Sequence, residues 1–360
     1  MHSSTDQFYP DYRTLDEFNL FDLDIVRLSL TNENILAWSR LNATQKDADS
    51  LCDAHLLNME LASDIALIER IRDESVAYLQ EEFEFPMPAP VQKATLQDLL
   101  AMAANQSSRH RQFCACTLLK AMHIINHFDA REARQALKLT DQELFKKAET
   151  RIYQTISAMM AQALPVVEFL GGRKQRASMV TKLLSKDDPL AAELFDKMRF
   201  RVVTATREDV IPTINFLSRT LFPFNYVLSG ETYNTLVPFG EYVNAHPQFN
   251  ELARHMELPK EEEDTAGSLA WNPHSSPTYQ VVHWVADMPI RIDDYKNAYI
   301  TDGVNPVPRP IIYIRAEIQI LDRQTHRQNE QGHASHKQYK ARQVESVLDK
   351  LKVRPSRPSD

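Results

Sequence analysis

The pattern of apolar and polar positions changes near Pro165 and divides the chain into two parts. From about residue 20 to residue 165, apolar residues recur at spacings of three and four, the period of helices that bury one face. The sequence "PMPAP" at 86–90 interrupts this pattern, and Thr140 followed by Glu143 forms a capping box that predicts a new helix start. The first part is therefore predicted to be helical.

After Pro165 the apolar residues gather in short runs that are typical of strands. "VVEFL" and "RFRVVTA" predict two strands, and "EDVIPTINFLSRTLF" predicts a helix that starts or is interrupted at Pro212. "TYQVVHWVADMPIRI" and "PIIYIRAEIQIL" predict two long strands. Residues 293–310 between them are rich in Gly, Pro, Asn and Asp, which favours an antiparallel hairpin. Together the two parts predict an α+β fold.

The length of 360 residues exceeds what one hydrophobic core usually supports, so we expect two lobes. We place a helical N-terminal domain at 1–140 and a second domain at 141–345, with a long insertion at about 223–278 that contains six prolines and the acidic run "KEEED". Residues 346–360 are expected to form a disordered basic tail.

Composition narrows the function classes. Hydrophobic residues make up 43% and charged residues 25%. No apolar run is long enough to cross a bilayer, and the N-terminus lacks the pattern of a signal peptide. We therefore expect a cytoplasmic protein without a membrane segment. Three cysteines offer no disulfide framework, and the net charge of -8 argues against a protein that coats nucleic acid. A local basic patch near the C-terminus stays possible.

Glycine is scarce, with seven in the whole chain, and neither G-x-G-x-x-G nor G-x-x-x-x-G-K-[ST] is present. A bound nucleotide would therefore need side-chain cations around its phosphates. The strand "AEIQI" places Glu317 and Gln319 on one face, which is either the solvent side of the sheet or the floor of a site.

Four further groups of polar residues precede or follow this strand. Downstream lie His326, Glu330 and His336; upstream lies "TYQVVH", with Tyr279, Gln280 and His283. "DKMRFRVV" places Asp196 five residues before Arg201, and "GGRKQRASMVTK" spaces Gly171, Lys174, Ser178 and Lys182 so that the last three form one row on a helix. Each group also has an ordinary explanation: a solvated helix face, a turn aspartate, a surface ion pair or sheet packing.

In this order, over residues 166–340, the four motifs resemble the synthetase domain of the RelA/SpoT family, the (p)ppGpp or alarmone synthetases of the stringent response. The resemblance implies a nucleotidyltransferase-like domain with a mixed, mainly antiparallel sheet flanked by helices. It implies a pyrophosphokinase (a transferase) that uses Mg²⁺ and moves a pyrophosphate from ATP to the 3′-hydroxyl of an acceptor nucleotide. GDP or GTP is the first candidate acceptor, and a homo-oligomer is possible.

The resemblance also implies roles for individual residues. Glu317 and Asp196 correspond to catalytic carboxylates that bind the metal. The donor ATP would be bound by Arg173, Lys174, Arg176, Ser178, Lys182 and Arg201. The acceptor would be bound by Tyr279, Gln280, His283, Gln319, His326, Glu330 and His336.

The sequence departs from the family at three places. The family's K-D-Y-I-x-x-P-K-x-N-G segment is replaced by "LAWNPHSSPTYQ", the Gly of D-x-x-G-x-R is Arg199, and the Arg-Thr after E-x-Q-I is Leu321-Asp322. Two alternatives follow: a degenerate synthetase fold that acts as a regulatory or interaction module, or a toxin-like transferase that acts on adenine nucleotides or on tRNA 3′ ends.

Long members of this family carry a hydrolase domain before the synthetase. Here "HIINHFD" supplies His123, His127 and Asp129, and two histidines four residues apart could hold a metal. No matching H-D pair lies elsewhere in the N-terminal part, so we expect histidines of an ordinary amphipathic helix and no hydrolase.

Overall fold

The structure is a computed structural model of the full chain. It describes residues 12–30, 44–104, 109–162, 164–173, 177, 180–181, 184, 198–228, 231–249, 276, 278–292, 294, 296–300, 308–331 and 335–352.

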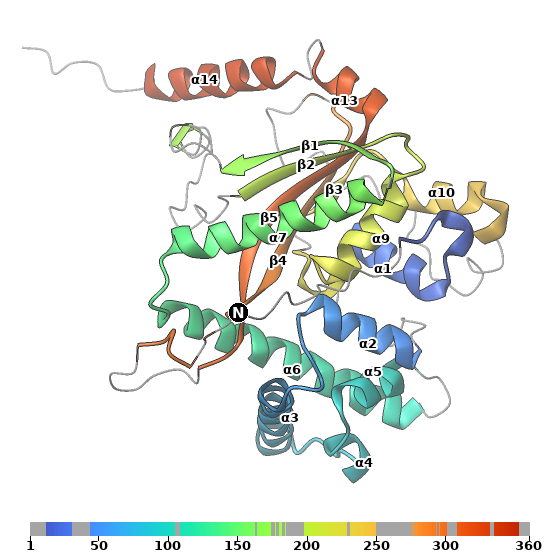
Figure 1. The fold of residues 1–360 in the computed structure, drawn as a ribbon, viewed down its shortest axis with the longest axis vertical. Coiled ribbons are helices and arrows are strands. Elements are labelled where there is room, and N and C mark those ends of the chain that lie inside the picture. Colours follow the sequence, from blue (N-terminus) through green and yellow to red (C-terminus); the bar gives the residue numbers. More distant parts are fainter. Residues whose placement is uncertain are drawn as a thin grey trace, which may run out of the picture.

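The longer elements follow the predicted order of helices first and strands afterwards (Figure 1). The helices are α1 (Leu20–Leu30), α2 (Gln45–Ala54), α3 (Ala62–Phe83), α4 (Ala89–Gln92), α5 (Leu96–Ala104), α6 (Arg109–Gln135), α7 (Asp141–Ala161), α9 (Val210–Thr220), α10 (Phe239–Ala245), α13 (Arg323–Asn329) and α14 (His336–Lys352). The strands are β1 (Val166–Arg173), β2 (Met198–Thr204), β3 (Tyr233–Asn234), β4 (Val282–Arg291) and β5 (Ile311–Asp322), and a short 3-10 helix, η4, spans Phe224–Tyr226.

Local sequence signals set several helix ends. The Thr140 side chain accepts a hydrogen bond from the backbone N–H of Glu143, whose carboxylate accepts one from the Thr140 N–H at 2.8 Å, so the predicted capping box is confirmed. Helix α3 ends at Phe83, where Glu84 takes a left-handed conformation with φ 48° just before the "PMPAP" segment. Pro212 lies in the first turn of α9, where proline costs no helix hydrogen bond.

The strands form one mixed sheet of order β1-β2-β5-β4-β3. Strands β2 and β5 pair in parallel, and the other neighbours pair antiparallel. The long hairpin of β4 and β5 pairs Val282 with Ile320 at one end and Arg291 with Ile311 at the other. The predicted α+β fold with a mixed, mainly antiparallel sheet and a central hairpin is confirmed.

The two faces of this sheet differ in chemistry. One face carries Phe200, Trp284, Ile318 and similar buried apolar side chains, which pack with α7 and α9 into the main core. Phe169 and Phe200 stack at 5.7 Å, and a Cβ at Gly171 would collide with the Phe200 ring. The glycine in the predicted phosphate-binding motif therefore also has a packing role. The opposite face is polar and is described below.

The helical part forms a second core built from α2, α3, α5 and α6, which gathers at one end of the molecule (Figure 1). Helix α1 contributes to both cores. Phe21 and Ile25 belong to this second core, whereas Leu23 and Val26 belong to the core next to the sheet. In the part of the chain that the structure describes, no helix is long and apolar enough to span a bilayer.

Two segments are more regular than the sequence suggested. Strand β3 and helix α10 lie inside the range 223–278 that was expected to be an insertion, and β3 extends the sheet next to β4. Helix α14 continues to Lys352, beyond residue 346 where a disordered tail was expected. The apolar residues Val344, Val347 and Leu348 have helical spacing, although Val344 and Leu348 are each 48% exposed.

Candidate active site on the polar face of the sheet

Strand register brings the polar side chains together. Arg199 on β2 is opposite Glu317 on β5, Arg201 is opposite Gln319, and His283 on β4 is also opposite Gln319. Because alternate residues of a strand face the same side, these five side chains share one face of the sheet. The sequence alone placed only Glu317 and Gln319 on a common face.

Glu317 is the centre of this face. Its Oε1 lies 3.0 Å from Nε of Arg199 and 2.9 Å from Nε2 of His283. The Glu317 and His283 side chains are 4% and 6% exposed, whereas Arg199 is 36% exposed. The Glu317 carboxylate is therefore enclosed. Of its two partners, Arg199 is the one that solvent reaches more easily.

The surroundings of His283 fix the orientation of its ring. Its Nδ1 lies 3.2 Å from the backbone carbonyl of Glu231, and its ring stacks on Tyr233 at 4.5 Å with 16° between the planes. Burial raises the pKa of Tyr233 above its ordinary value. One ring nitrogen of His283 therefore faces the Glu231 carbonyl, and the other faces the Glu317 carboxylate.

Arg201 organises a second cluster next to Glu317. Its guanidinium donates to Oε1 of Gln319 at 2.9 and 3.1 Å, to Glu330 at 2.8 Å and to the hydroxyl of Tyr279 at 3.4 Å. Its Nη1 is also 3.3 Å from Nδ1 of His326. Arg201 was assigned to the donor from the sequence, but here it contacts four residues that were assigned to the acceptor.

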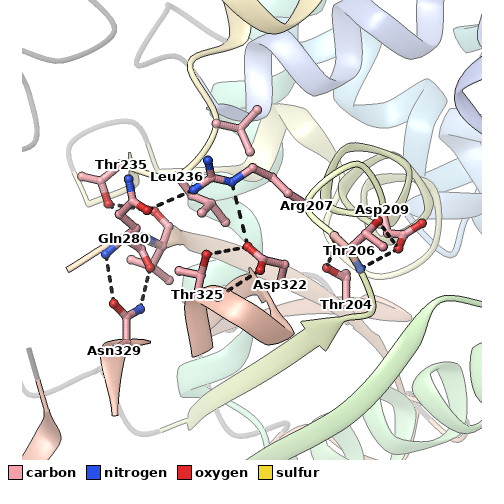
Figure 2. A network of polar contacts seen from close by, with 12 residues as sticks. Thr204, Thr206, Arg207, Asp209, Thr235, Leu236, Gln280, Asp322, Thr325 and Asn329 are labelled. Carbon is pink, nitrogen blue, oxygen red and sulfur yellow. Dashed lines mark hydrogen bonds and ion pairs between the residues drawn. The ribbon is translucent and has the colours of Figure 1, made fainter. Parts of the chain in front are cut away.

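Gln280 belongs to a neighbouring network (Figure 2). Its side-chain oxygen accepts a hydrogen bond from Arg207 at 3.0 Å, and its backbone is held on both sides by the amide of Asn329. Arg207 also lies 3.9 Å from Asp322, which caps α13 through the backbone N–H of Thr325. Gln280 and Asn329 thus hold α13, which carries His326, against the segment before β4.

The polar face continues from Glu317 toward α6. Arg315 donates to Asp287 at 3.1 Å and to Glu231 at 3.2 Å, and His127 of α6 lies 3.6 Å from Asp287. Asp129, the other residue of "HIINHFD", forms an ion pair with Arg70 at 2.6 Å. His127 and Asp129 therefore each have a partner of their own. In the described chain they do not form a metal-binding group with His123.

Seven predicted site residues cannot be placed in this cluster. Arg173 is the last residue of β1 and His336 is the first of α14, but their side chains lie outside the described part of the chain. Outside the described residues lie Lys174, Arg176, Ser178, Lys182 and Asp196. Their assignment to ATP and metal stays a prediction.

Sequence reasoning overlooked Arg199, Tyr233 and Asn329 as members of the site. In the sequence Arg199 stands out only as a departure from the family pattern. It lies two residues before Arg201, which predicts that both side chains lie on the same face of a strand. Tyr233 lies in the segment that was treated as an insertion. No pattern in the sequence indicates that the side chain of Asn329 holds the backbone of a residue 49 positions away.

The described residues contain no group of three or more His, Cys, Asp or Glu side chains arranged for a metal ion. Glu317 is a hard oxygen ligand of the type that Mg²⁺ prefers, but Arg199 and His283 meet one of its oxygens. The second predicted ligand, Asp196, lies outside the described residues.

No protein-family model and no curated protein matches the chain. Among solved structures, small alarmone synthetase 2 from Bacillus subtilis matches at 14% identity, over 59% of this chain and 91% of that chain, with a TM-score of 0.29. Small alarmone synthetase 1 from the same organism gives the same values. A GTP pyrophosphokinase family protein from Streptococcus pneumoniae matches at 13%, over 58% and 84%, with a TM-score of 0.29.

The chain is similar to small alarmone synthetases. This is the family that its four motifs resemble. At these identities and TM-scores the likeness says nothing about the activity of this chain.

Proposed function

We propose that the chain is an ATP-dependent pyrophosphokinase that transfers pyrophosphate from ATP to the 3′-hydroxyl of an acceptor nucleotide. The observation that best supports this proposal is the position of Glu317, an enclosed carboxylate that contacts both Arg199 and His283 in the polar face of the sheet. A carboxylate in such a place can accept the proton of an attacking hydroxyl, and the nearby cations can stabilise phosphate charge.

Arg199 would change partners when substrate binds. In the chain without ligand its charge neutralises Glu317. A polyphosphate carries more negative charge than one carboxylate and offers better acceptors to a guanidinium, so it can draw Arg199 away. Glu317 then loses its contact with Arg199, and its carboxylate can turn to the acceptor hydroxyl. This exchange would couple activation of the base to the arrival of phosphate.

The cluster around Arg201 would position the acceptor. The hydroxyl of Tyr279 is only loosely held, at 3.4 Å from both Arg201 and Gln319, so its ring can adjust to a base that stacks on it. Glu330 and His326 contact Nη1 of Arg201 and hold the guanidinium in position. Arg201 therefore acts in this proposal as the anchor of the acceptor side.

The donor would be held by the basic motif after β1, with Arg173, Lys174, Arg176, Ser178 and Lys182 around the triphosphate. Mg²⁺ is usually bound through substrate phosphates together with one or two carboxylates, and Glu317 and Asp196 are the residues that would supply them. The ion would neutralise charge on the phosphates during transfer.

The test is a transfer assay with ATP labelled on its γ-phosphate, Mg²⁺, and a panel of GDP, GTP, ADP and tRNA. The expected result is label on one acceptor together with an equal amount of AMP. Glu317→Gln should abolish both products, whereas Glu345→Gln, on the exposed side of α14, should leave them unchanged. ATP binding without AMP formation for every acceptor would overturn the proposed reaction.

A second candidate function is a nucleotide-binding regulatory module without transfer. The contact between Arg199 and Glu317 favours it, because this contact occupies the carboxylate that the reaction needs. This candidate predicts that nucleotide binds with unchanged affinity in Glu317→Gln and that no acceptor becomes labelled. Formation of AMP in the transfer assay would exclude it.

A further inference from the structure

A cavity of about 80 Å³ lies between the helical part and the beginning of β5, away from the site described above. It is partly open to solvent. Apolar side chains of α2, α3, α5 and α6 form most of its wall, including Leu51, Ile71, Leu100 and Met122. Its polar lining consists of His55, His123, Asn126, Asn225, Tyr226, Arg309 and Tyr313, together with Cys52.

The one cation in this lining is buried and bonded to neutral acceptors. Arg309 is 1% exposed, and it donates to the carbonyl of Ile311 at 2.8 Å, to the carbonyl of Asn126 at 3.0 Å and to the side-chain oxygen of Asn126. The amide nitrogen of Asn126 donates in turn to the hydroxyls of Tyr226 and Tyr313. Three of the five N–H donors of Arg309 are therefore already bonded to neutral oxygens of the chain.

The two histidines of the lining are neutral at physiological pH. Burial lowers the pKa of His55 to about 3 and that of His123 to about 4. Nε2 of His55 donates to the side-chain oxygen of Asn225 at 2.9 Å, and Nδ1 of His123 lies 3.5 Å from the amide nitrogen of the same asparagine. This arrangement leaves Nδ1 of His55 as an acceptor and the Nε2–H of His123 as a donor.

We propose that this cavity binds a small neutral one-ring molecule that carries a single hydroxyl or amide group. An apolar cavity of about 150 Å³ holds benzene, so a cavity of half that volume with an open side can hold one ring with an edge in solvent. Tyr226 stacks on Tyr313 at 4.3 Å and lies 4.7 Å from the His123 ring, which gives the ligand an aromatic wall. A donor and an acceptor in this wall match one polar group on the ring.

This site is distinct from the nucleotide site but shares a strand with it. Tyr313 and Glu317 are four residues apart on β5, which corresponds to roughly 13 Å along a strand. A nucleotide does not suit the cavity, because its phosphates would meet mostly apolar walls and a buried arginine with three of its donors already bonded. Binding here therefore does not depend on the proposed pyrophosphokinase reaction.

The experiment measures binding to the full chain without ATP, by calorimetry and by thermal unfolding at pH 8. The probes are phenol, toluene and benzoate. Phenol and toluene should bind saturably and raise the unfolding temperature, whereas benzoate should do neither. Leu100→Trp should fill the cavity and lower the affinity for phenol at least tenfold, whereas Leu348→Trp, at an exposed position of α14, should leave it unchanged.

A second variant tests the polar contact and does not depend on whether Leu100→Trp folds. His123→Phe keeps a ring of similar size but removes the N–H donor, so the affinity for phenol should fall about fivefold while that for toluene is retained. Equal binding of benzoate and phenol, absence of saturable binding by either neutral ring, or unchanged phenol affinity in a folded Leu100→Trp protein would overturn the proposal.

Discussion

Arg199 and Glu317 face each other across the parallel strands β2 and β5, with Nε of the arginine 3.0 Å from Oε1 of the carboxylate. His283 approaches the same oxygen from the antiparallel strand on the other side. The central strand thus places its carboxylate between two basic groups, of which only the arginine is substantially exposed. A phosphate that approaches from solvent would reach Arg199 first.

The first prediction concerns stability. Arg199→Met keeps most of the side-chain length but removes its charge, so we expect a loss of about 1–2 kcal/mol in the free energy of unfolding, less than for a fully buried pair because Arg199 is partly solvated. Urea unfolding measures this loss. In a Glu317→Gln background the same substitution should cost about 1 kcal/mol less, because no unpaired carboxylate remains. Equal costs in both backgrounds would show that the pair contributes nothing.

The second prediction concerns the chemical step. Glu317→Gln and Asp196→Asn should each reduce transfer at least about 100-fold, because an amide neither accepts the hydroxyl proton nor holds Mg²⁺ as a carboxylate does. Circular dichroism and the unfolding temperature should show an intact fold, and Glu345→Gln serves as the exposed control. A wild-type rate in either variant would end its catalytic assignment.

The third prediction concerns the donor. If Lys182 contacts the triphosphate, Lys182→Ala should raise the apparent constant for ATP about tenfold, which corresponds to ~1.4 kcal/mol. Lys174 and Ser178 should act in the same direction, since the spacing of four predicts that the three side chains form one row on a helix. Lys350→Ala, in the last part of α14, is the control at a lysine outside the motif. If the ATP titration does not change on substitution of Lys182, this lysine does not contact the triphosphate of ATP.

The fold and the shared face of Glu317 and Gln319 could be predicted from the sequence because their signals are local. Alternation along "AEIQI" gives the shared face of Glu317 and Gln319, and the two long apolar runs give the central hairpin. Thr140 and Glu143 determine a helix start within a few residues. Such signals do not depend on which strand lies next to which.

The contacts that the sequence could not provide depend on register between distant segments. Arg199 meets Glu317 only because β2 inserts beside β5 in parallel, and Tyr233 reaches His283 only because a short segment of an expected insertion pairs with β4. The basic motif after β1 could be recognised by its spacing, but its geometry toward the polar face lies outside the described residues.

The fourth prediction concerns the acceptor. Tyr279→Ala should weaken acceptor binding by about 1–3 kcal/mol if a base stacks on the ring, whereas Tyr279→Phe should change it little, since the hydroxyl contacts are long. Acceptor kinetics of the two variants measure the difference. A K-x-N-G graft over residues 275–278 should increase the use of GDP or GTP relative to other acceptors. Equal losses in Phe and Ala variants would assign the effect to the hydroxyl, and unchanged kinetics in both would leave Tyr279 as sheet packing.

The last prediction follows from the two buried histidines of the cavity. Their pKa values, about 3 for His55 and about 4 for His123, lie below the ordinary value of 6.5, so the unfolded chain takes up these protons first as the pH falls. The stability that they contribute is complete above pH 6.5 and is lost as the pH falls toward 4, by at most about 1.4 kcal/mol per pH unit for each histidine.

Denaturant unfolding between pH 7 and 4.5 should therefore show a steeper loss of stability in the wild-type chain than in His55→Gln/His123→Gln, even if the variant is less stable at pH 7. Carboxylates also titrate near the lower end of this range, but they are common to both proteins, so the difference between the two curves isolates the histidines. His110→Gln, at an exposed position of the same helix as His123, should follow the wild-type curve. Parallel curves for the wild type and the double variant would mean that the folded chain accommodates the two protons without cost, and the neutral character assigned to the cavity would then be wrong.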